Sequence, residues 1–314
     1  NKKKILYKLG YFKIWKKMKT AVGIDIGGTI TKIGLVSEEG VCIKKTSFRT
    51  KEETSFSSYI NKLVNSINII VGDEKILGIG IGAPNASKNG TIETPANLKW
   101  NGKLNLVKDL REKLNYNIHL SNDANCAAVG EMQYGNAKNL NDFIVITLGT
   151  GLGSGIVSNG MLVEGSDGFA AELGHFSINN KSRYTGLGVK GGLEAYVSAT
   201  GIKRTIMYML SKYMYDSVFR GISFNDLHGE EITKAANDGD KIAIKAYEYT
   251  GRILGDSLAN FVTFSQPEAI ILTGGLAHSG KWILNPTKKA FEKKLLPFYK
   301  NKVKILLSGL EDKD

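Results

Sequence analysis

The stretch Asp25-Ile26-Gly27-Gly28-Thr29 decides how this sequence is expected to fold. It closes an apolar run, and because Gly27 and Gly28 lack side chains, their backbone N–H groups can approach an anion closely. Thr29 adds a hydroxyl donor, whereas the carboxylate of Asp25 would repel a bare phosphate unless Mg²⁺ lay between them. We therefore predict a phosphate-binding turn, with a plain hairpin turn as the alternative.

The residues around this stretch predict a mixed sheet. Three β-type runs, Thr20–Ile26, Ile30–Val36 and Val41–Phe48, are separated by short turns, which is typical of an antiparallel meander. Two further apolar runs, at 76–81 and ending at residue 121, each follow a segment with apolar residues at helical spacing. Two strands that arrive through helical crossovers would complete an α/β sheet with ligand loops at its strand ends.

The same order of elements begins again in the second half of the chain. The runs Phe143–Leu148, Gly153–Ser158 and Met161–Glu164 are followed by long helical stretches and the strand Ala269–Thr273. Two similar halves that face each other would leave a cleft between them. We predict two domains of the β-β-β-α-β-α type, a small one over 18–136 and a large one over 137–314, with a hinge and an interdomain cleft.

A second glycine-rich turn occupies the matching place in the second half. Residues 149–155 hold four glycines in seven positions, and Thr147, Thr150 and Ser154 add hydroxyl groups. A third pair, Gly274-Gly275, follows the strand at 269–273 and would let a base or ribose lie against the backbone. Turns at both sides of one cleft favour a nucleotide polyphosphate as the ligand.

Candidate residues for a second ligand lie in other loops. Asp123 follows a strand and opens a helical segment, where it would either point into the cleft or cap the helix. Four planar polar residues also lie in glycine-flanked loops, namely Asn97, Glu172, His175 and Glu194. Such groups suit the hydroxyls of a sugar, although each taken singly is explained as well by an ordinary hydrogen-bonded polar residue.

Charge and composition exclude several classes of function. The net charge of +12 includes eight lysines within residues 1–19, so the rest of the chain carries only four net positive charges. We expect residues 1–17 to be a disordered basic extension and no nucleic acid to bind. An apolar run of 18 residues is absent from the sequence, so we expect a cytoplasmic protein without membrane attachment. Cys42 and Cys126 are expected to be free, buried thiols.

Several motifs together resemble the ROK family of sugar kinases, from about residue 19 to residue 314. They are D-I-G-G-T-I-T-K-I-G-L-V from Asp25, G-I-G-A-P ending at Pro84, N-D-A-N-C-A-A from Asn122, L-G-T-G-L-G-S-G from Leu148, E-L-G-H from Glu172 and G-L-E-A-Y-V-S-A-T-G from Gly192. The resemblance implies the actin-like ATPase (ribonuclease H-like) fold. It also implies an enzyme that uses ATP and Mg²⁺ to phosphorylate a hexose, and a homodimer.

The resemblance assigns a role to each candidate residue. Asp123 would be the catalytic base, Asp25 would hold Mg²⁺ through water, and the substrate would contact Asn97, Asn122, Glu172, His175 and Glu194. The nucleotide would contact Asp25, Gly27, Gly28, Thr29, Lys32, Thr150, Gly151, Gly153, Gly274 and Gly275. The glucokinase branch is the most similar, which implies that glucose is converted to glucose 6-phosphate. N-acetylmannosamine or N-acetylglucosamine kinase is the alternative, and a sugar-sensing regulator without enzymatic activity is a further one.

Two departures from the family pattern qualify these expectations. The family usually places three zinc-binding cysteines where this sequence has Thr185, Leu187 and Gly192. We therefore expect no zinc, and a loop around His175 that has lost a metal brace. Relatives also continue into a final helix on the first domain. Either further residues follow Asp314 and return to that domain, or the domain is less well covered here.

Overall fold

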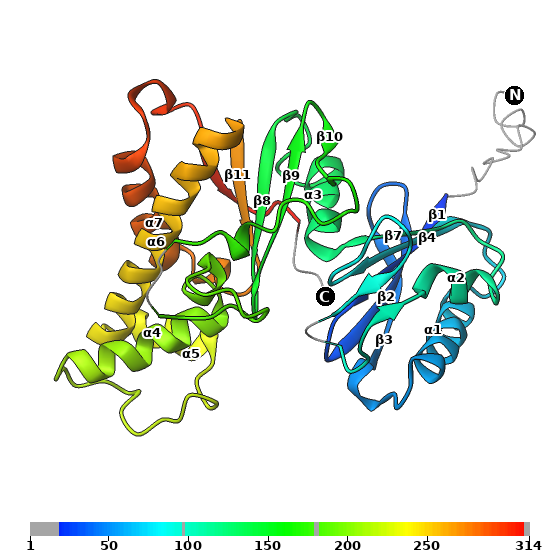
Figure 1. The fold of residues 1–314 in the computed structure, drawn as a ribbon, viewed down its shortest axis with the longest axis horizontal. Helices are drawn as coiled ribbons and strands as arrows, with labels where there is room; N and C mark the ends of the chain where they lie inside the picture. The colour runs from blue at the N-terminus through cyan, green and yellow to red at the C-terminus, as the bar shows by residue number, and fades with distance from the viewer. Residues whose placement is uncertain (1–18, 96–97, 179–181, 311–314) are drawn as a thin grey trace, which may run out of the picture.

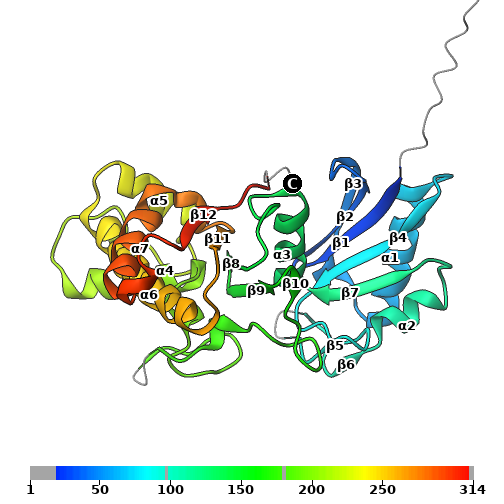
Figure 2. The same ribbon diagram turned by 90° about the horizontal axis from the view of Figure 1, so that it is seen from above.

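The computed structural model describes residues 19–95, 98–178 and 182–310 and divides the chain into two halves, each built on one five-stranded sheet (Figure 1). The two sheets lie side by side, and helix α3 stands between them in both views (Figures 1 and 2). The fold is of the actin-like ATPase class, in agreement with the prediction. The predicted extension at 1–17 lies outside the described residues.

The first sheet has the strand order β3-β2-β1-β4-β7. The first three strands form the antiparallel meander, and β4 and β7 join it in parallel. Parallel neighbours need crossovers, which α1 and α2 supply. The elements of this half are β1 (Thr20–Ile26), β2 (Ile30–Ser37), β3 (Cys42–Arg49), α1 (Phe56–Val71), β4 (Ile76–Ala83), β5 (Ile92–Glu93), β6 (Lys103–Leu104), α2 (Leu106–Arg111) and β7 (Ile118–Asn122), with a 3₁₀ turn at Thr50–Glu52.

Helix α1 closes the core on one face of the first sheet. Ile60, Leu63 and Ile67 recur at helical spacing and are buried. Ser55 caps the helix by accepting from the N–H of Ser58, and Gly72 ends it with a positive φ of 54°. The helix and its sheet fix the direction in which β1 and β4 deliver their loops.

The second sheet repeats the same topology, with the order β10-β9-β8-β11-β12. Again three antiparallel strands are followed by two parallel ones. Its elements are α3 (Asp123–Tyr134), β8 (Phe143–Leu148), β9 (Leu152–Ser158), β10 (Met161–Leu162), α4 (Ala199–Lys212), α5 (Gly229–Asn237), α6 (Lys241–Ser265), β11 (Ala269–Thr273), α7 (Lys281–Lys294) and β12 (Lys304–Leu307), with 3₁₀ turns at Leu173–His175, Leu193–Ala195, Ala277–Ser279 and Pro297–Tyr299. The internal repeat predicted from the sequence is therefore confirmed.

Both faces of the second sheet are covered, which explains why its central strand β8 is almost entirely buried. The long helix α6 contributes Leu254 and Leu258 to the larger core on one face. On the other face α3 places Ala128 against Phe143 and Val145 of β8. Because α3 starts at the end of β7 in the first sheet and packs on the second sheet, its first turn lies where the two halves meet.

The structure corrects three details of the sequence prediction. The third strand of the second half ends at Leu162 and not at Glu164, although the N–H of Val163 still donates to the carbonyl of Ile156 over 2.8 Å. Strand β12 was not predicted, because four residues are too few to show a periodicity. Cys42 is free but exposed, since it lies on the exposed edge strand β3, and Cys126 is only half-buried.

Among the described residues, none of the helices combines the length and the apolar character that crossing a membrane would require.

Candidate active site

A cavity of about 670 Å³ is lined by both halves of the molecule. It collects loops from the ends of β1, β4 and β7 in the first sheet, and from β8, the 3₁₀ turns and β11 in the second. The predicted residues that line it are Asp25, Gly27, Gly28, Asn122, Asp123, Thr150, Gly151, Gly153, Glu172, His175, Glu194 and Gly274. Residues that are far apart in sequence thus share one space.

Three predicted residues do not line the cavity, and a fourth lies outside the described residues. Thr29, Lys32 and Gly275 are not among the residues that line the cavity. Lys32 is opposite Asp25 in the register of β1 and β2. Burial and the charge of Asp123 raise the pKa of that carboxyl, and the charge of Lys32 opposes them only in part. Asn97 lies outside the described residues. For these four, as for the predicted residues that line the cavity, the role in binding stays a prediction.

The first glycine turn is a hairpin that closes on itself. The N–H of Gly27 donates to the carbonyl of Ile30 over 3.1 Å, and a Cβ on Gly27 would lie only 2.8 Å from that oxygen. A larger residue would therefore push the turn open. Asp25 is the next-to-last residue of the strand before the turn and lines the cavity.

The second glycine turn is held by hydrogen bonds from the first residues of helix α4. The carbonyl of Gly149 accepts from the N–H of Ala199 over 2.8 Å, at the start of α4. The carbonyl of Thr150 accepts from the hydroxyl of Thr200 over 3.0 Å. Both carbonyls are thus turned toward α4, which fixes the conformation of the turn at the cavity wall.

Asp123 opens helix α3 but is not its N-cap. That position belongs to Asn122, whose Oδ1 accepts from the N–H groups of Ala124 and Asn125 over 2.8 and 3.4 Å. The carboxylate of Asp123 accepts from the N–H of Ala124 over 2.8 Å, and Asp123 lines the cavity. Since Asn122 caps the helix, the capping alternative does not account for Asp123.

Three carboxyl groups that line the cavity have a raised pKa and therefore keep a proton to higher pH than isolated carboxyl groups do. Burial, followed by repulsion from Asp123, raises the pKa of Asp25. Burial also raises the pKa of Asp123, against a smaller opposing effect of backbone hydrogen bonds. The pKa of Glu172 is raised by burial and by the negative charges of Asp123 and Glu194, although His175 opposes this. Concentrated negative charge of this kind favours a cation as a neighbour.

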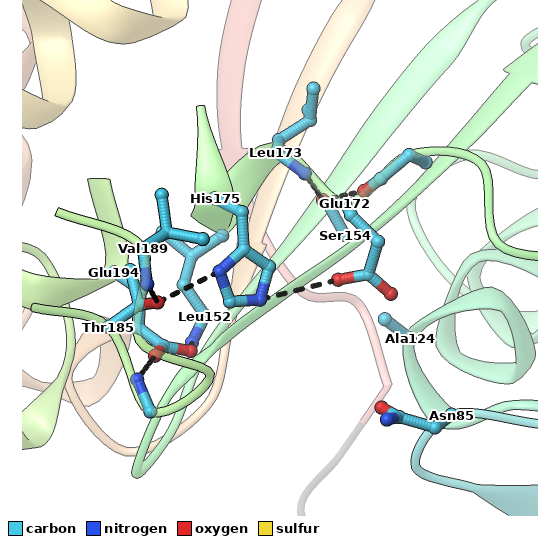
Figure 3. Close-up of polar contacts among 12 residues, drawn as sticks. Asn85, Ala124, Leu152, Ser154, Glu172, Leu173, His175, Thr185, Val189 and Glu194 are labelled. Carbon is cyan, nitrogen blue, oxygen red and sulfur yellow. Dashed lines mark hydrogen bonds and ion pairs between the residues drawn. The ribbon is translucent and has the colours of Figure 1, made fainter. Parts of the chain in front are cut away.

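A polar cluster of Glu172, His175 and Glu194 in the second half lines the cavity (Figure 3). Glu172 and His175 belong to one turn, with 3.9 Å between Oε2 and Nε2. Ser154 on β9 holds this turn, because its hydroxyl donates to the carbonyl of Ala171 and accepts from the N–H of Leu173. The carboxylate and imidazole are therefore fixed by the sheet below them.

Glu194 joins this cluster to the second glycine turn. One of its carboxylate oxygens accepts from the N–H of Leu152 over 3.0 Å and the other from the N–H of Gly186 over 2.7 Å. A Cβ on Gly151 would lie 2.4 Å from the same carboxylate, so the close approach depends on glycine. One side chain thereby connects the glycine turn with the loop at 184–191.

Among the other lining residues, Asn85, Thr147 and Arg204 were not assigned a role in binding from the sequence. Asn85 follows β4 in a left-handed conformation with a φ of 51°, and its amide donates to the carbonyls of Glu93 and Thr94. The hydroxyl of Thr147 is buried and has no partner among the described residues. Arg204 on α4 donates to the carbonyl of Tyr184 over 2.9 Å. The position of Asn85 directly after a strand was a usable signal, whereas the sequence gives no comparable sign for Arg204.

Comparisons with known proteins agree with this geometry. Residues 21–314 match the sequence profile of the ROK family. The glucokinase of Thermotoga maritima is 29% identical over 292 residues, which is 92% of each chain. The xylose repressor of Caldicellulosiruptor bescii is 28% identical over 95% of this chain and 76% of its own length. A solved structure of a ROK family glucokinase from Streptomyces griseus, in complex with glucose and AMPPNP, has a TM-score of 0.80 and 28% identity and covers 93% of this chain and 95% of its own.

Proposed function

Because this chain belongs to the ROK family, we propose that it is a sugar kinase that transfers the terminal phosphoryl group of ATP to a hexose. Glucose is the proposed acceptor and glucose 6-phosphate the product. The observation that carries the proposal is the single cavity in which two glycine turns and the carboxylate of Asp123 meet. The similarity to glucokinases along nearly the whole chain supports the same choice.

The two turns are the proposed site for the polyphosphate. Gly27 and Gly28 on one side, and Thr150 and Gly151 on the other, leave space for phosphate oxygens close to the backbone. Thr147 is the next-to-last residue of β8, and its hydroxyl, which has no partner among the described residues, is proposed as a further donor for this ligand. Arg204 brings a positive charge to the same cavity.

Asp25 fits the proposed magnesium site. Mg²⁺ in kinases is usually held by one or two carboxylates together with substrate phosphates and water. The carboxylates of Asp25 and Asp123 repel each other across the cavity, so a divalent cation there would relieve that repulsion. When bound, Mg²⁺ would neutralise charge that develops on the transferred phosphoryl group.

Asp123 is the proposed base. The bond between the γ-phosphorus and its bridging oxygen breaks, the bond between the sugar hydroxyl oxygen and that phosphorus forms, and the hydroxyl proton passes to a carboxylate oxygen of Asp123. A loose transition state needs little early deprotonation, so the main task of the carboxylate is to aim the hydroxyl oxygen. A pKa raised by burial makes the carboxylate a better proton acceptor than a solvated aspartate.

The other sugar hydroxyls would contact the cluster around Glu172, His175 and Glu194, together with Asn122 at the start of α3. Asn97 remains proposed as a further contact. Carboxylates accept and imidazoles donate or accept hydrogen bonds, so this set can bind several neighbouring hydroxyls at once.

An assay of ADP release with MgATP and a panel of sugars tests the proposal. We expect turnover with glucose that exceeds turnover with N-acetylglucosamine or N-acetylmannosamine. In Asp123→Asn, turnover should fall by about 100-fold or more while nucleotide binding persists, because general base and positioning effects are of this size. Asp73→Asn, which changes an exposed carboxylate outside the cavity, is the control.

Each alternative outcome has a meaning. Higher kcat/KM with an N-acetylated hexosamine would assign the protein to that class of kinase. Unchanged turnover in Asp123→Asn would remove Asp123 from the role of base. Sugar binding without any ADP release would contradict the kinase and favour a sugar-sensing function like that of the repressor relative.

A further inference from the structure

The hydroxyl of Thr185 contacts the imidazole of His175 at the edge of the cavity (Figure 3). The two atoms, Thr185 Oγ1 and His175 Nδ1, lie 3.1 Å apart. The same hydroxyl oxygen lies 3.1 Å from the backbone nitrogen of Val189, which donates to it. Thr185 is 6% exposed, so water does not compete freely for this hydroxyl.

The loop holds Thr185 rigidly in this place. Its own N–H donates to the carbonyl of Val189 over 3.0 Å, and its carbonyl accepts from the N–H of Gly188 over 3.0 Å. A Cβ on Gly192 would lie 2.4 Å from the methyl group of Thr185, so the side chain packs closely over that glycine. The hydroxyl therefore has little freedom to turn to other partners.

A count of protons fixes the direction of the bond to His175. A hydroxyl has one proton and two lone pairs, and a backbone N–H is a donor only. The bond from Val189 therefore uses a lone pair, and the hydroxyl proton is left for His175 Nδ1. If Nδ1 carried a proton instead, the hydroxyl would receive two donors, and its own proton would be buried without an acceptor among the described residues.

We propose that Thr185 is a positioning residue that fixes His175 in the tautomer with its proton on Nε2. Nε2 faces Oε2 of Glu172 at 3.9 Å, which is too long for a direct hydrogen bond. A hydroxyl group between them would accept from Nε2–H and donate to the carboxylate. By fixing the tautomer, Thr185 would hold His175 Nε2–H ready to bind one sugar hydroxyl together with the Glu172 carboxylate. This consequence rests on the proposed function.

This arrangement gives the loop a fixed histidine without a metal ion. The sequence predicts that this loop has lost a metal brace, because Thr185 stands where the family usually has a zinc-binding cysteine. The hydrogen bond from the Thr185 hydroxyl would restrain both the orientation and the tautomer of the ring in place of that brace.

Two variants separate the hydroxyl from the shape of the side chain. Thr185→Val keeps the branched shape but removes the hydroxyl, and Thr185→Ser keeps the hydroxyl but removes the methyl group. Long-range ¹H–¹⁵N spectra of the full chain, with the His175 signals assigned from His175→Gln, report the tautomer directly. We expect the Nε2–H form in the wild type and in Thr185→Ser, and a mixture of forms in Thr185→Val.

Kinetics give the second readout. In Thr185→Val, KM for the sugar should rise about five- to tenfold, the effect of one lost hydrogen bond of roughly 1 kcal/mol. KM for ATP and kcat should change little, and Thr185→Ser should restore most of the sugar affinity. If Thr185 had a purely structural role, the thermal midpoints of both variants would fall instead, and KM for the sugar would not change separately from KM for ATP and kcat.

An Nδ1–H signal in the wild type, or the same tautomer in the wild type and in Thr185→Val, would overturn the proposal. The spectra need no turnover. If no sugar were phosphorylated but Nε2–H were observed and lost in Thr185→Val, the proposed function would fail while the role of Thr185 stood.

Discussion

The two glycine turns occupy equivalent places in the two halves but are held in different ways. The turn after β1 closes through the bond from Gly27 to Ile30, and its one backbone tie to a later segment of the described chain is the bond from the N–H of Thr50 to the carbonyl of Thr29 over 2.9 Å. The turn after β8 depends on partners 42 to 50 positions later, namely Glu194, Ala199 and Thr200. The second turn also has an internal bond, from the N–H of Gly149 to the carbonyl of Gly151 over 3.1 Å. A repeated sequence pattern can therefore give two turns that both close internally but differ in how strongly they are coupled to distant residues.

The coupling through Glu194 should produce the largest effect. In Glu194→Ala, the N–H groups of Leu152 and Gly186 both lose their acceptor, so the glycine turn and the sugar-side loop are released together. We expect kcat/KM to fall about 100-fold, as two unsatisfied donors cost roughly 1–3 kcal/mol each. Initial rates over a grid of ATP and sugar concentrations should show that both KM values rise.

The control for this variant is Glu248→Ala, which removes an exposed glutamate of α6 and should leave both KM values unchanged. A rise in KM for the sugar alone would mean that Glu194 contacts only the sugar, and the contrast between the two turns would disappear.

Alanine at one glycine of each turn sharpens the comparison. In Gly27→Ala the new Cβ would lie 2.8 Å from the carbonyl oxygen of Ile30, so the hairpin must distort. We expect the free energy of unfolding to fall by about 2 kcal/mol, together with weaker ATP binding. A Cβ on Gly149 meets nothing within 4 Å, so Gly149→Ala should weaken ATP binding without loss of stability.

Urea denaturation and nucleotide titration of the two variants separate these effects. Equal losses of stability would show that the second turn is as tightly closed as the first, contrary to the contacts described here.

Charge distinguishes the first turn in another way, since burial and the charge of Asp123 raise the pKa of Asp25. A carboxyl with a raised pKa keeps its proton longer in the folded state than in the unfolded state. Its contribution to stability is complete below the unfolded pKa of about 3.9 and is lost as the pH rises through the raised value. The stability of the variant Asp25→Asn relative to the wild type should therefore increase as the pH increases.

Thermal midpoints in the absence of nucleotide, measured from about pH 3 to about pH 7, check this sign. Asp73→Asn is the matched control, and the difference between its thermal midpoint and that of the wild type should not grow with pH. If the thermal midpoint of Asp25→Asn fell relative to that of the wild type as the pH rose, the effect of Lys32 on the pKa of Asp25 would outweigh burial and repulsion.

The sequence was sufficient to predict what local patterns determine. Alternating apolar residues predicted the strands of both meanders, and the glycines at 27, 28, 151 and 153 were placed correctly at the ends of strands. Asp123 could be expected at the cavity because the end of a strand leads directly into a helix. These features depend on neighbours within a few positions.

Contacts between loops could not be predicted in the same way. Nothing near Glu194 in the sequence indicates that its two oxygens bind N–H groups 42 residues before it and 8 residues before it. The bond between Thr185 and His175 likewise depends on how two irregular loops pack. Such loops have no periodicity, and their conformation follows from tertiary contacts.

The smallest expected effect is that of a single hydrogen bond between the second turn and α4. It tests whether the individual hydrogen bonds to this turn contribute separately to ATP binding. Thr200→Val removes the hydroxyl that donates to the carbonyl of Thr150 over 3.0 Å, but this bond is exposed and water can replace it. We expect KM for ATP to rise only about two- to threefold and KM for the sugar to stay constant, in line with a net hydrogen-bond contribution of roughly 0.5 kcal/mol. Thr200→Ser should behave as the wild type. If Thr200→Val raised both KM values, as Glu194→Ala is expected to, the ATP and sugar sides would be coupled through the whole turn and its contacts with α4. Glu194 would then not be the residue that couples them.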